Sequence, residues 1–233
     1  MKSILLQASA DLVTATDSTG VDVENVEQMN VLDIALNGGV MLIPIVVLSI
    51  IAIYLLVERY LTIKKARHFD PLFMKRIKDM VLEGNIKGAQ SLCEATNTPI
   101  ARMLEKGLSR IGKPLEDVQV AVQNVGNLEV SKLEKGMPIL ATISGAAPMI
   151  GFLGTVTGMI KTFYTLSQNA DGIQVGSLSG GIYEAMVTTV GGLIVGIIAY
   201  ISYNSLTAMI DKVIYRMEST SLEFLDILHE PAS

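Results

Sequence analysis

The sequence predicts an all-α integral membrane protein with three transmembrane helices. Half of the 233 residues are hydrophobic and only 18% are charged, which is little charge for a soluble domain of this size. Three runs contain no Asp, Glu, Lys or Arg, and each is long enough to cross about 30 Å of hydrocarbon as a helix. These runs cover residues 34–57, 137–160 and 185–210. No strand-like alternation of apolar and polar residues accompanies them.

The first part of the chain is divided into an acidic segment, a membrane helix and a helical region. Residues 1–37 are polar, and their stretch VEQMNVLDIAL predicts a short amphipathic helix at the outer interface. The stretch ILLQASA resembles a secretory signal only weakly. The first transmembrane helix is expected at 38–57, where Ile, Leu and Val suit contact with lipid. A cytoplasmic helical domain at 58–136 follows, divided at EGN, TNTP and GKP, with a helix cap predicted at Thr98 before Pro99.

The second part contains the other two membrane helices. We expect the second transmembrane helix at 137–160, a short connector at 161–181 and the third transmembrane helix at 182–210. A C-terminal cytoplasmic helix is expected at 211–233. Apolar residues at helical spacing precede the second membrane helix and follow the third. Both helices are therefore expected to extend beyond the membrane and to pack within the cytoplasmic domain.

The distribution of Lys and Arg predicts the orientation in the membrane. Residues 58–136 carry 14 of the 18 Lys and Arg residues, whereas the segment before the first run has Lys2 alone against six acidic residues. Cytoplasmic segments are the ones enriched in Lys and Arg. The N-terminus is therefore expected outside and the C-terminus inside. Basic residues beside a membrane also fit contact with anionic lipid.

Several classes of function are disfavoured by composition. The 14 basic residues of the middle segment are offset by ten acidic ones and come with few aromatic residues, so nucleic acid is not an expected partner. His68 and His229 lie far apart and the single Cys93 forms no thiolate cluster, so no metal site or other cofactor is expected. Motifs of hydrolases and P-loop proteins are absent, so the chain is not expected to be an enzyme. Cys93 is interpreted as a small buried thiol in a reducing compartment.

The stretch GFLGTVTGMIKTF, which begins at Gly151, imitates a phosphate-binding loop, but all except its last three residues lie within the second apolar run. It also lacks the Gly-Lys-Ser/Thr ending of such a loop. Small residues instead permit close contact between helices in lipid. The residues assigned to helix packing are Pro148, Gly151, Gly154, Gly158, Gly192 and Gly196.

Glu184 is the strongest candidate for chemistry, because an ionised carboxylate at membrane depth is costly and should face protein or water. Such a group can carry a proton, with neighbouring hydroxyls completing a relay. The alternative is an interfacial glutamate that contacts headgroups or caps a helix. At 100° per residue Thr188 shares the helix face of Glu184.

Two stretches, APMIGFLGTVTGMIKTF and GIYEAMVTTVGGLIVGIIAYISYN, resemble the signature helices of the ExbB/TolQ proton-channel family, which is more distantly related to MotA. VERY at the end of the first apolar run and LEKGMPILATIS before the second also fit this family. The similarity covers most of the chain and is greatest to ExbB. Three spans with the N-terminus outside also match ExbB and TolQ rather than four-span MotA. The long acidic N-terminal segment departs from shorter family members.

The resemblance implies a homopentamer in the bacterial inner membrane, with the second and third helices lining a central pore. That pore would enclose an ExbD- or TolR-like dimer, and proton passage would drive a TonB- or TolA-like protein that energises outer-membrane transport. The pore glutamate would be Glu184, and the pore threonines would be Thr155 and Thr189. Because Thr189 lies about 140° from Glu184 around an ideal helix, Thr188 also stays a candidate.

Two alternatives stay open. One is a TolQ-like subunit for envelope integrity, and another is a non-conducting membrane scaffold. A secondary transporter is disfavoured, because the three spans show no duplicated half.

Overall fold

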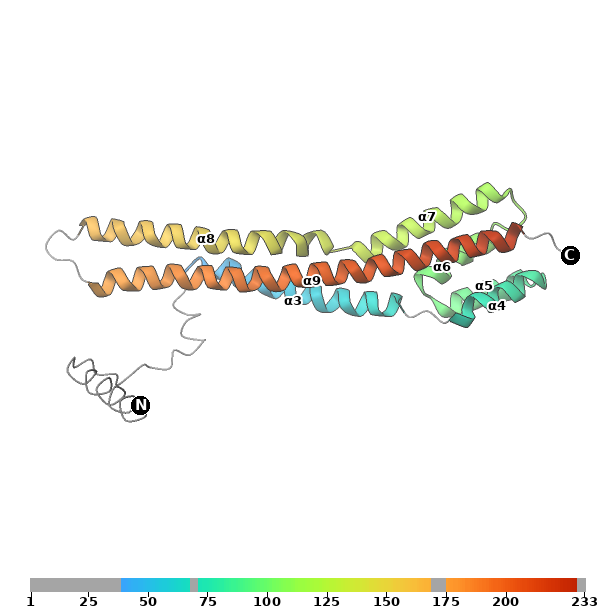
Figure 1. Ribbon diagram of the computed structural model, residues 1–233, viewed down its shortest axis with the longest axis horizontal. Helices are drawn as coiled ribbons and strands as arrows, with labels where there is room; N and C mark the ends of the chain where they lie inside the picture. Colours follow the sequence, from blue (N-terminus) through green and yellow to red (C-terminus); the bar gives the residue numbers. More distant parts are fainter. Residues whose placement is uncertain (1–38, 68–70, 169–174, 230–233) are drawn as a thin grey trace, which may run out of the picture. The chain divides into compact units, whose positions relative to one another are not determined.

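The computed structural model describes residues 39–67, 71–168 and 175–229, and over these ranges the chain is helical without strands. The helices are α3 (Leu42–Ala66), α4 (Pro71–Leu82), α5 (Ile86–Thr96), α6 (Pro99–Leu108), α7 (Leu115–Glu134), α8 (Met137–Gln168) and α9 (Val175–His229). Figure 1 shows α8 and α9 side by side, with α3 along α9 and α7 continuing from α8 towards the C-terminal end of α9. Within these ranges, three helical stretches are long and apolar enough to cross a membrane, which confirms the predicted class.

The helix boundaries differ from the predicted ones at three places. α3 begins at Leu42 rather than at 38, because Gly39 has a φ of +65° that no helix residue adopts. α8 continues to Gln168 and α9 starts at Val175, so the connector predicted at 161–181 narrows to 169–174. Residues 161–168 contain neither Gly nor Pro, and the single charge of Lys161 does not end a helix. The predicted helix at the outer interface, within 1–37, lies outside the described residues.

The segments predicted at 182–210 and 211–233 form one unbroken helix, α9, as expected of a third membrane helix that extends beyond the membrane. At 1.5 Å per residue its 55 residues extend for about 80 Å. About 30 Å of that length is enough to cross the hydrocarbon, so the remainder projects from it. No Pro or Gly lies in α9 after Gly196, which explains why the helix continues.

The short helices between α3 and α8 have defined ends. The Oγ1 atom of Thr98 accepts a hydrogen bond of 3.3 Å from the backbone N of Ala101, so the predicted cap of α6 is present. Asn85 caps α5 in the same way, and Asn97 ends α5 with a left-handed φ of 46°. Gly136, with a φ of +83°, separates α7 from α8. These breaks let the chain fold back on α9.

The core of this region forms where α6 and α7 meet the end of α9. Phe224 of α9 is fully buried, and a Cβ atom added to Gly107 of α6 would lie 2.5 Å from its ring. The same added atom would lie 2.7 Å from Val122 of α7. Three helices therefore meet around one aromatic side chain.

A buried carboxylate joins α6 to α7. Glu129 is 3% exposed, and its two oxygens accept hydrogen bonds of 2.5 Å from Arg102 and 2.6 Å from Lys132. Arg102 also donates to the backbone O and the side-chain Oδ1 of Asn97, at 3.0 and 2.6 Å. A buried carboxylate is tolerated only when it is paired in this way. These hydrogen bonds hold the N-terminal end of α6 against α7.

Cys93 is the buried thiol that the sequence predicted. It is fully buried in α5, and burial, followed by the nearby charges of Glu105 and Glu94, raises its pKa to about 12. At neutral pH the group is a thiol rather than a thiolate, and thiols are poor nucleophiles. Cys93 therefore serves packing.

Candidate functional site

The candidate site lies along the line where α8 and α9 touch, and glycines bring their backbones together there. A Cβ atom added to Gly192 would lie 2.5 Å from the carbonyl O of Ala147 and 2.9 Å from Cα of Gly151. Farther along, one added to Gly154 would lie 2.5 Å from the methyl group of Thr188. Real side chains essentially never come this close. We call this line of contact the α8–α9 seam, defined by Ala147, Gly151, Gly154, Gly158, Ala185, Thr188, Gly192 and Gly196.

Pro148 also lies in this seam. Its ring lies against Gly196, and a side chain at position 196 would clash with this ring. A proline cannot donate to the carbonyl one turn before it, which here is that of Ser144. A Cβ atom added to Gly196 would lie 3.2 Å from that oxygen. Gly196 therefore makes room for the ring of Pro148 and for the carbonyl group of Ser144, which the proline leaves without a hydrogen bond inside α8.

Thr155 of α8 and Thr189 of α9 meet through their hydroxyl groups, which form a hydrogen bond with each other. The Thr189 hydroxyl also lies 3.0 Å from the carbonyl O of Gly151, and that of Thr155 lies 3.5 Å from the carbonyl O of Ala185. Both side chains are partly exposed within the single chain. Because a hydroxyl both donates and accepts, two hydroxyls in contact can pass a proton between helices.

Thr188 has a different environment from its neighbour Thr189. It is 2% exposed and lies in the seam, and its hydroxyl donates to the backbone O of Glu184 at 2.9 Å. Of the two threonines, Thr189 is thus the partly exposed one that meets Thr155. The seam residues of α9 recur at intervals of three and four, and Thr189 follows one of them by a single residue, or about 100°.

Glu184 lies nine residues inside α9, because the helix begins at Val175 rather than at 182. Its side chain is partly exposed, and its carboxylate rests against the backbone of Gly39, just before α3. No hydrogen bond among the described residues joins this carboxylate to Thr155 or Thr189. The structure therefore brings the two threonines together and places Glu184 on the side of α9 that faces the start of α3.

Gly39 and Thr162 are the residues of this region that sequence reasoning missed. The Thr162 hydroxyl fills the position that a Cβ atom would take at Gly181, and Thr162 is 7% exposed despite following Lys161. Gly39 belongs to the pair Gly38-Gly39 before the first apolar run. A glycine pair before a helix signals a special backbone conformation, but not which side chain packs against it.

We expect Gly39→Ala to move the carboxylate of Glu184. The added methyl group would occupy the position of this carboxylate, and the φ of +65° would strain any residue other than glycine. A displaced carboxylate loses the cover of the Gly39 backbone, so the rate at which a hydrophobic carbodiimide modifies Glu184 should rise. Mass spectrometry of the peptide that contains Glu184 measures this rate. Gly145→Ala is the control, since its Cβ atom would meet nothing within 4 Å, and equal rates in both variants would refute the contact.

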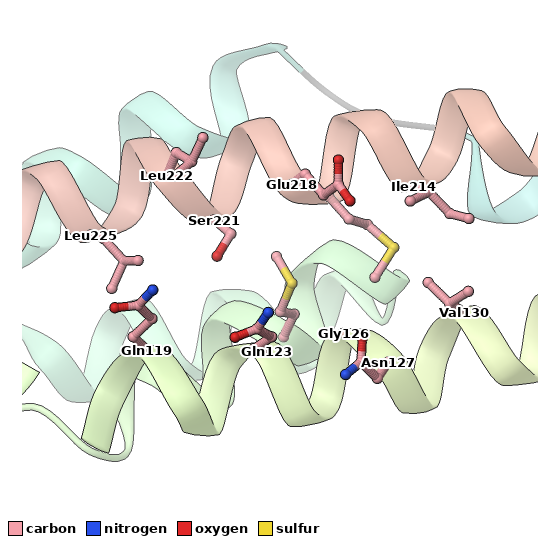
Figure 2. A pocket seen from close by; sticks show the side chains of 12 residues that line it. Gln119, Gln123, Gly126, Asn127, Val130, Ile214, Glu218, Ser221, Leu222 and Leu225 are labelled. Atoms are coloured by element: carbon pink, nitrogen blue, oxygen red, sulfur yellow. The ribbon is translucent and has the colours of Figure 1, made fainter. Parts of the chain in front are cut away.

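A cavity lined by both apolar and polar side chains lies at the opposite end of α9, away from the seam. It has a volume of about 440 Å³ and lies between α7 and α9. Figure 2 shows Gln119 and Gln123 of α7 opposite Leu225 and Ser221 of α9. Among the described residues, no three His, Cys, Asp or Glu side chains are grouped as metal ligands would be. Neither Thr155 nor Glu184 lines this cavity.

A model of the MotA/TolQ/ExbB proton channel family matches residues 95–219, which is more than half of the chain. The chain belongs to this family. The matched range includes Thr155, Glu184 and Thr189, so the family similarity and the candidate site coincide. The family is one of proton channels and not of enzymes. Membership confirms the resemblance that the two signature stretches indicated.

Relatives of both the ExbB and the TolQ type are similar to this family member. A putative biopolymer transport protein, ExbB-like 1, of Synechocystis sp. is 29% identical over 180 residues, which cover 76% of this chain and 71% of the relative. The Tol-Pal system protein TolQ of Haemophilus influenzae is 26% identical over 220 residues, covering 88% and 96%. The biopolymer transport protein ExbB of Neisseria meningitidis serogroup A is 26% identical over 188 residues, covering 73% and 84%.

Proposed function

We propose that this chain is the proton-channel subunit of an energy-transducing complex, which couples the proton motive force to mechanical work. The observation that carries the proposal is the contact between the Thr155 and Thr189 hydroxyls. They come from two apolar helices whose close contacts are made mainly at glycine and alanine residues. Hydroxyl contacts of this kind hold membrane helices together, and here the pair lies on the same two helices as the ionisable Glu184, a group that marks a functional site at membrane depth.

Glu184 is proposed to hold the proton, and the hydroxyl pair to accept it. Five residues separate Glu184 from Thr189, which corresponds to about 7.5 Å along the helix axis. A carboxyl group that takes up a proton at the outer end of α9 could deliver it inward through a hydroxyl or a water molecule. One proton crossing 100 mV releases about 2.3 kcal/mol, so several protons per working cycle are proposed.

Exposed apolar surfaces support the proposed assembly as a homopentamer around a central pore. Many large apolar side chains of α8 and α9 are more than one third exposed in the single chain. They include Phe152, Val156, Ile160, Ile194, Ile197, Ile198 and Ile201. Some can face lipid, but copies of the chain and the helices of a partner would cover the rest. The proposed partners are an ExbD- or TolR-like dimer within the pore and a TonB- or TolA-like protein beyond it.

The proposed location is the bacterial inner membrane, with the N-terminus in the periplasm and the C-terminus in the cytoplasm. The enrichment of Lys and Arg in residues 58–136 supports this orientation. With it, Glu184 lies towards the periplasmic end of α9, on the side from which protons enter an energised cell.

The test is proton flux through liposomes that contain the chain together with a one-span partner bearing an Asp in its membrane helix. A potassium gradient with valinomycin sets the membrane potential, and a trapped pH-sensitive dye reports proton entry. We expect the wild type to conduct. The double variant Thr155→Val/Thr189→Val should conduct roughly tenfold more slowly, a smaller loss than the 10²–10⁴ of a direct acid or base.

Thr142→Val/Thr157→Val is the matched control, because these two hydroxyls donate to carbonyls of their own helix at 2.8 and 2.9 Å. The control should conduct like the wild type. Wild-type liposomes no more permeable than empty ones would overturn the proposal in favour of a non-conducting scaffold. Equal losses in both double variants would remove the hydroxyl pair from the pathway.

The TolQ-like alternative is supported by the near-complete coverage of the relative from Haemophilus influenzae. Complementation separates the two branches. Rescue of energised outer-membrane uptake in a strain that lacks ExbB supports the ExbB-like role, and rescue of detergent resistance in a strain that lacks TolQ supports the other.

A further inference from the structure

A second cavity, of about 280 Å³, lies where the end of α3 meets α6 and α7. It would hold about nine water molecules at liquid density. Three cationic side chains line it: Lys65 of α3, Arg102 of α6 and Lys132 of α7. Among the described residues, Glu129 is the only acidic one in its lining. We propose that this cavity binds the phosphate group of an anionic phospholipid headgroup.

The charges around the cavity favour an anion. Glu129 pairs with Arg102 and Lys132 at 2.5 and 2.6 Å, which leaves an excess of two positive charges in the lining. These pairs also fix the directions of two of the cations. Arg102 also donates hydrogen bonds to Asn97, so its guanidinium group is positioned before a ligand arrives. An anion entering this cavity meets charges that need little rearrangement.

The beginning of α6 adds a neutral donor to the lining. The Thr98 hydroxyl accepts a hydrogen bond from the backbone N–H of Ala101, and the hydroxyl can donate its own proton to a ligand oxygen. Thr98 stands at the positive end of the dipole of α6, a helix of ten residues. Fixed cations, a hydroxyl donor and a helix N-terminus together match the oxygens of a phosphate group better than those of a single carboxylate.

The depth of the cavity indicates a lipid rather than a soluble phosphate. The first charge-free run ends at Val57, and Lys65 follows it by eight residues, or about 12 Å along the helix. The headgroup layer extends about 5–8 Å beyond the hydrocarbon on each side. The cavity therefore lies just outside this layer, and the long side chain of Lys65 can extend back to the headgroups. In the proposed orientation these headgroups belong to the cytoplasmic leaflet, where anionic lipids concentrate.

The experiment places the full-length chain in nanodiscs of equal parts phosphatidylglycerol and phosphatidylcholine. Native mass spectrometry counts the lipids of each kind that stay bound after the disc is removed. We expect the wild type to retain phosphatidylglycerol preferentially. Lys65→Gln/Lys132→Gln should weaken this retention more than tenfold, since each lost charge near an anionic surface costs about a factor of five. In that variant Arg102 still forms its ion pair with Glu129.

Lys87→Gln/Lys113→Gln removes the same charge from exposed sites outside the cavity and should retain phosphatidylglycerol like the wild type. Equal retention in all three proteins, or equal losses in both variants, would overturn the proposal. A second arm titrates inorganic phosphate, followed by phosphorus NMR line width, into chains held in phosphatidylcholine discs. Saturable phosphate binding that depends on Lys65 and Lys132, without preference for phosphatidylglycerol, would overturn the lipid assignment. Neither arm measures proton flux, so failure here is distinguishable from failure of the proposed function.

Discussion

Gly192→Ala is expected to force α8 away from α9 and to destabilise the folded membrane protein by about 3 kcal/mol, the upper range for overpacking a tightly packed site. The new methyl group would lie 2.5 Å from the carbonyl O of Ala147 and 2.9 Å from Cα of Gly151. Both are backbone atoms, so no change of rotamer relieves the clash. The helices must separate, and the hydrogen bond between Thr155 and Thr189 must lengthen with them.

Unfolding by dodecyl sulfate in mixed micelles, followed by circular dichroism, measures this loss. Gly145→Ala supplies the comparison, because it makes the same chemical change on α8 where nothing lies within 4 Å. Alanine has the higher helix propensity, so that variant should be as stable as the wild type or slightly more stable. Equal stability of the two variants would mean that the backbones do not approach as closely as described.

Glu184→Gln is expected to reduce proton flux by about 100-fold or more, because the amide keeps the shape of the side chain but cannot exchange a proton in the same way. The liposome assay described above measures the loss. Since the side chain is partly exposed and its neighbour Gly39 contributes only backbone, the variant should fold and assemble normally. Glu184→Asp keeps the ionisable group on a shorter side chain and should retain part of the flux.

Glu223→Gln is a suitable control, because it neutralises an exposed carboxylate near the C-terminal end of the same helix. We expect that variant to conduct normally. Wild-type flux in Glu184→Gln, with the partner present, would remove this residue from the pathway. Loss of the assembled complex in the same variant would instead give Glu184 a structural role.

Composition and periodicity were sufficient to predict the all-helical class and three apolar spans, because the hydrocarbon imposes a minimum length of uncharged helix. The cap at Thr98 was also predictable, since a threonine before a proline has few other conformations to adopt. Where α8 ends was not predictable from apolar runs. A helix can continue past Lys161 when nothing breaks it, although hydropathy ends there.

The candidate site, too, could be predicted from the sequence only in part. Glycine spacing indicated that α8 and α9 pack closely, but a helical wheel gives only relative angles within one helix. A helical wheel does not show which of Thr188 and Thr189 is buried against α8 and which is partly exposed. That depends on how α9 is rotated about its axis relative to α8. The packing of Gly39 against Glu184 joins residues far apart in sequence, and no local pattern encodes it.

The unbroken course of α9 has a mechanical consequence. Forty residues separate Glu184 from Phe224, so the two ends of this stretch lie about 60 Å apart on one helix. If this stretch tilts by about 5° around Glu184 as a rigid rod, Phe224 moves by about 5 Å, which is the length of one helical turn. The helix acts as a lever, and Phe224, wedged between Gly107 and Val122, would carry the movement to α6 and α7.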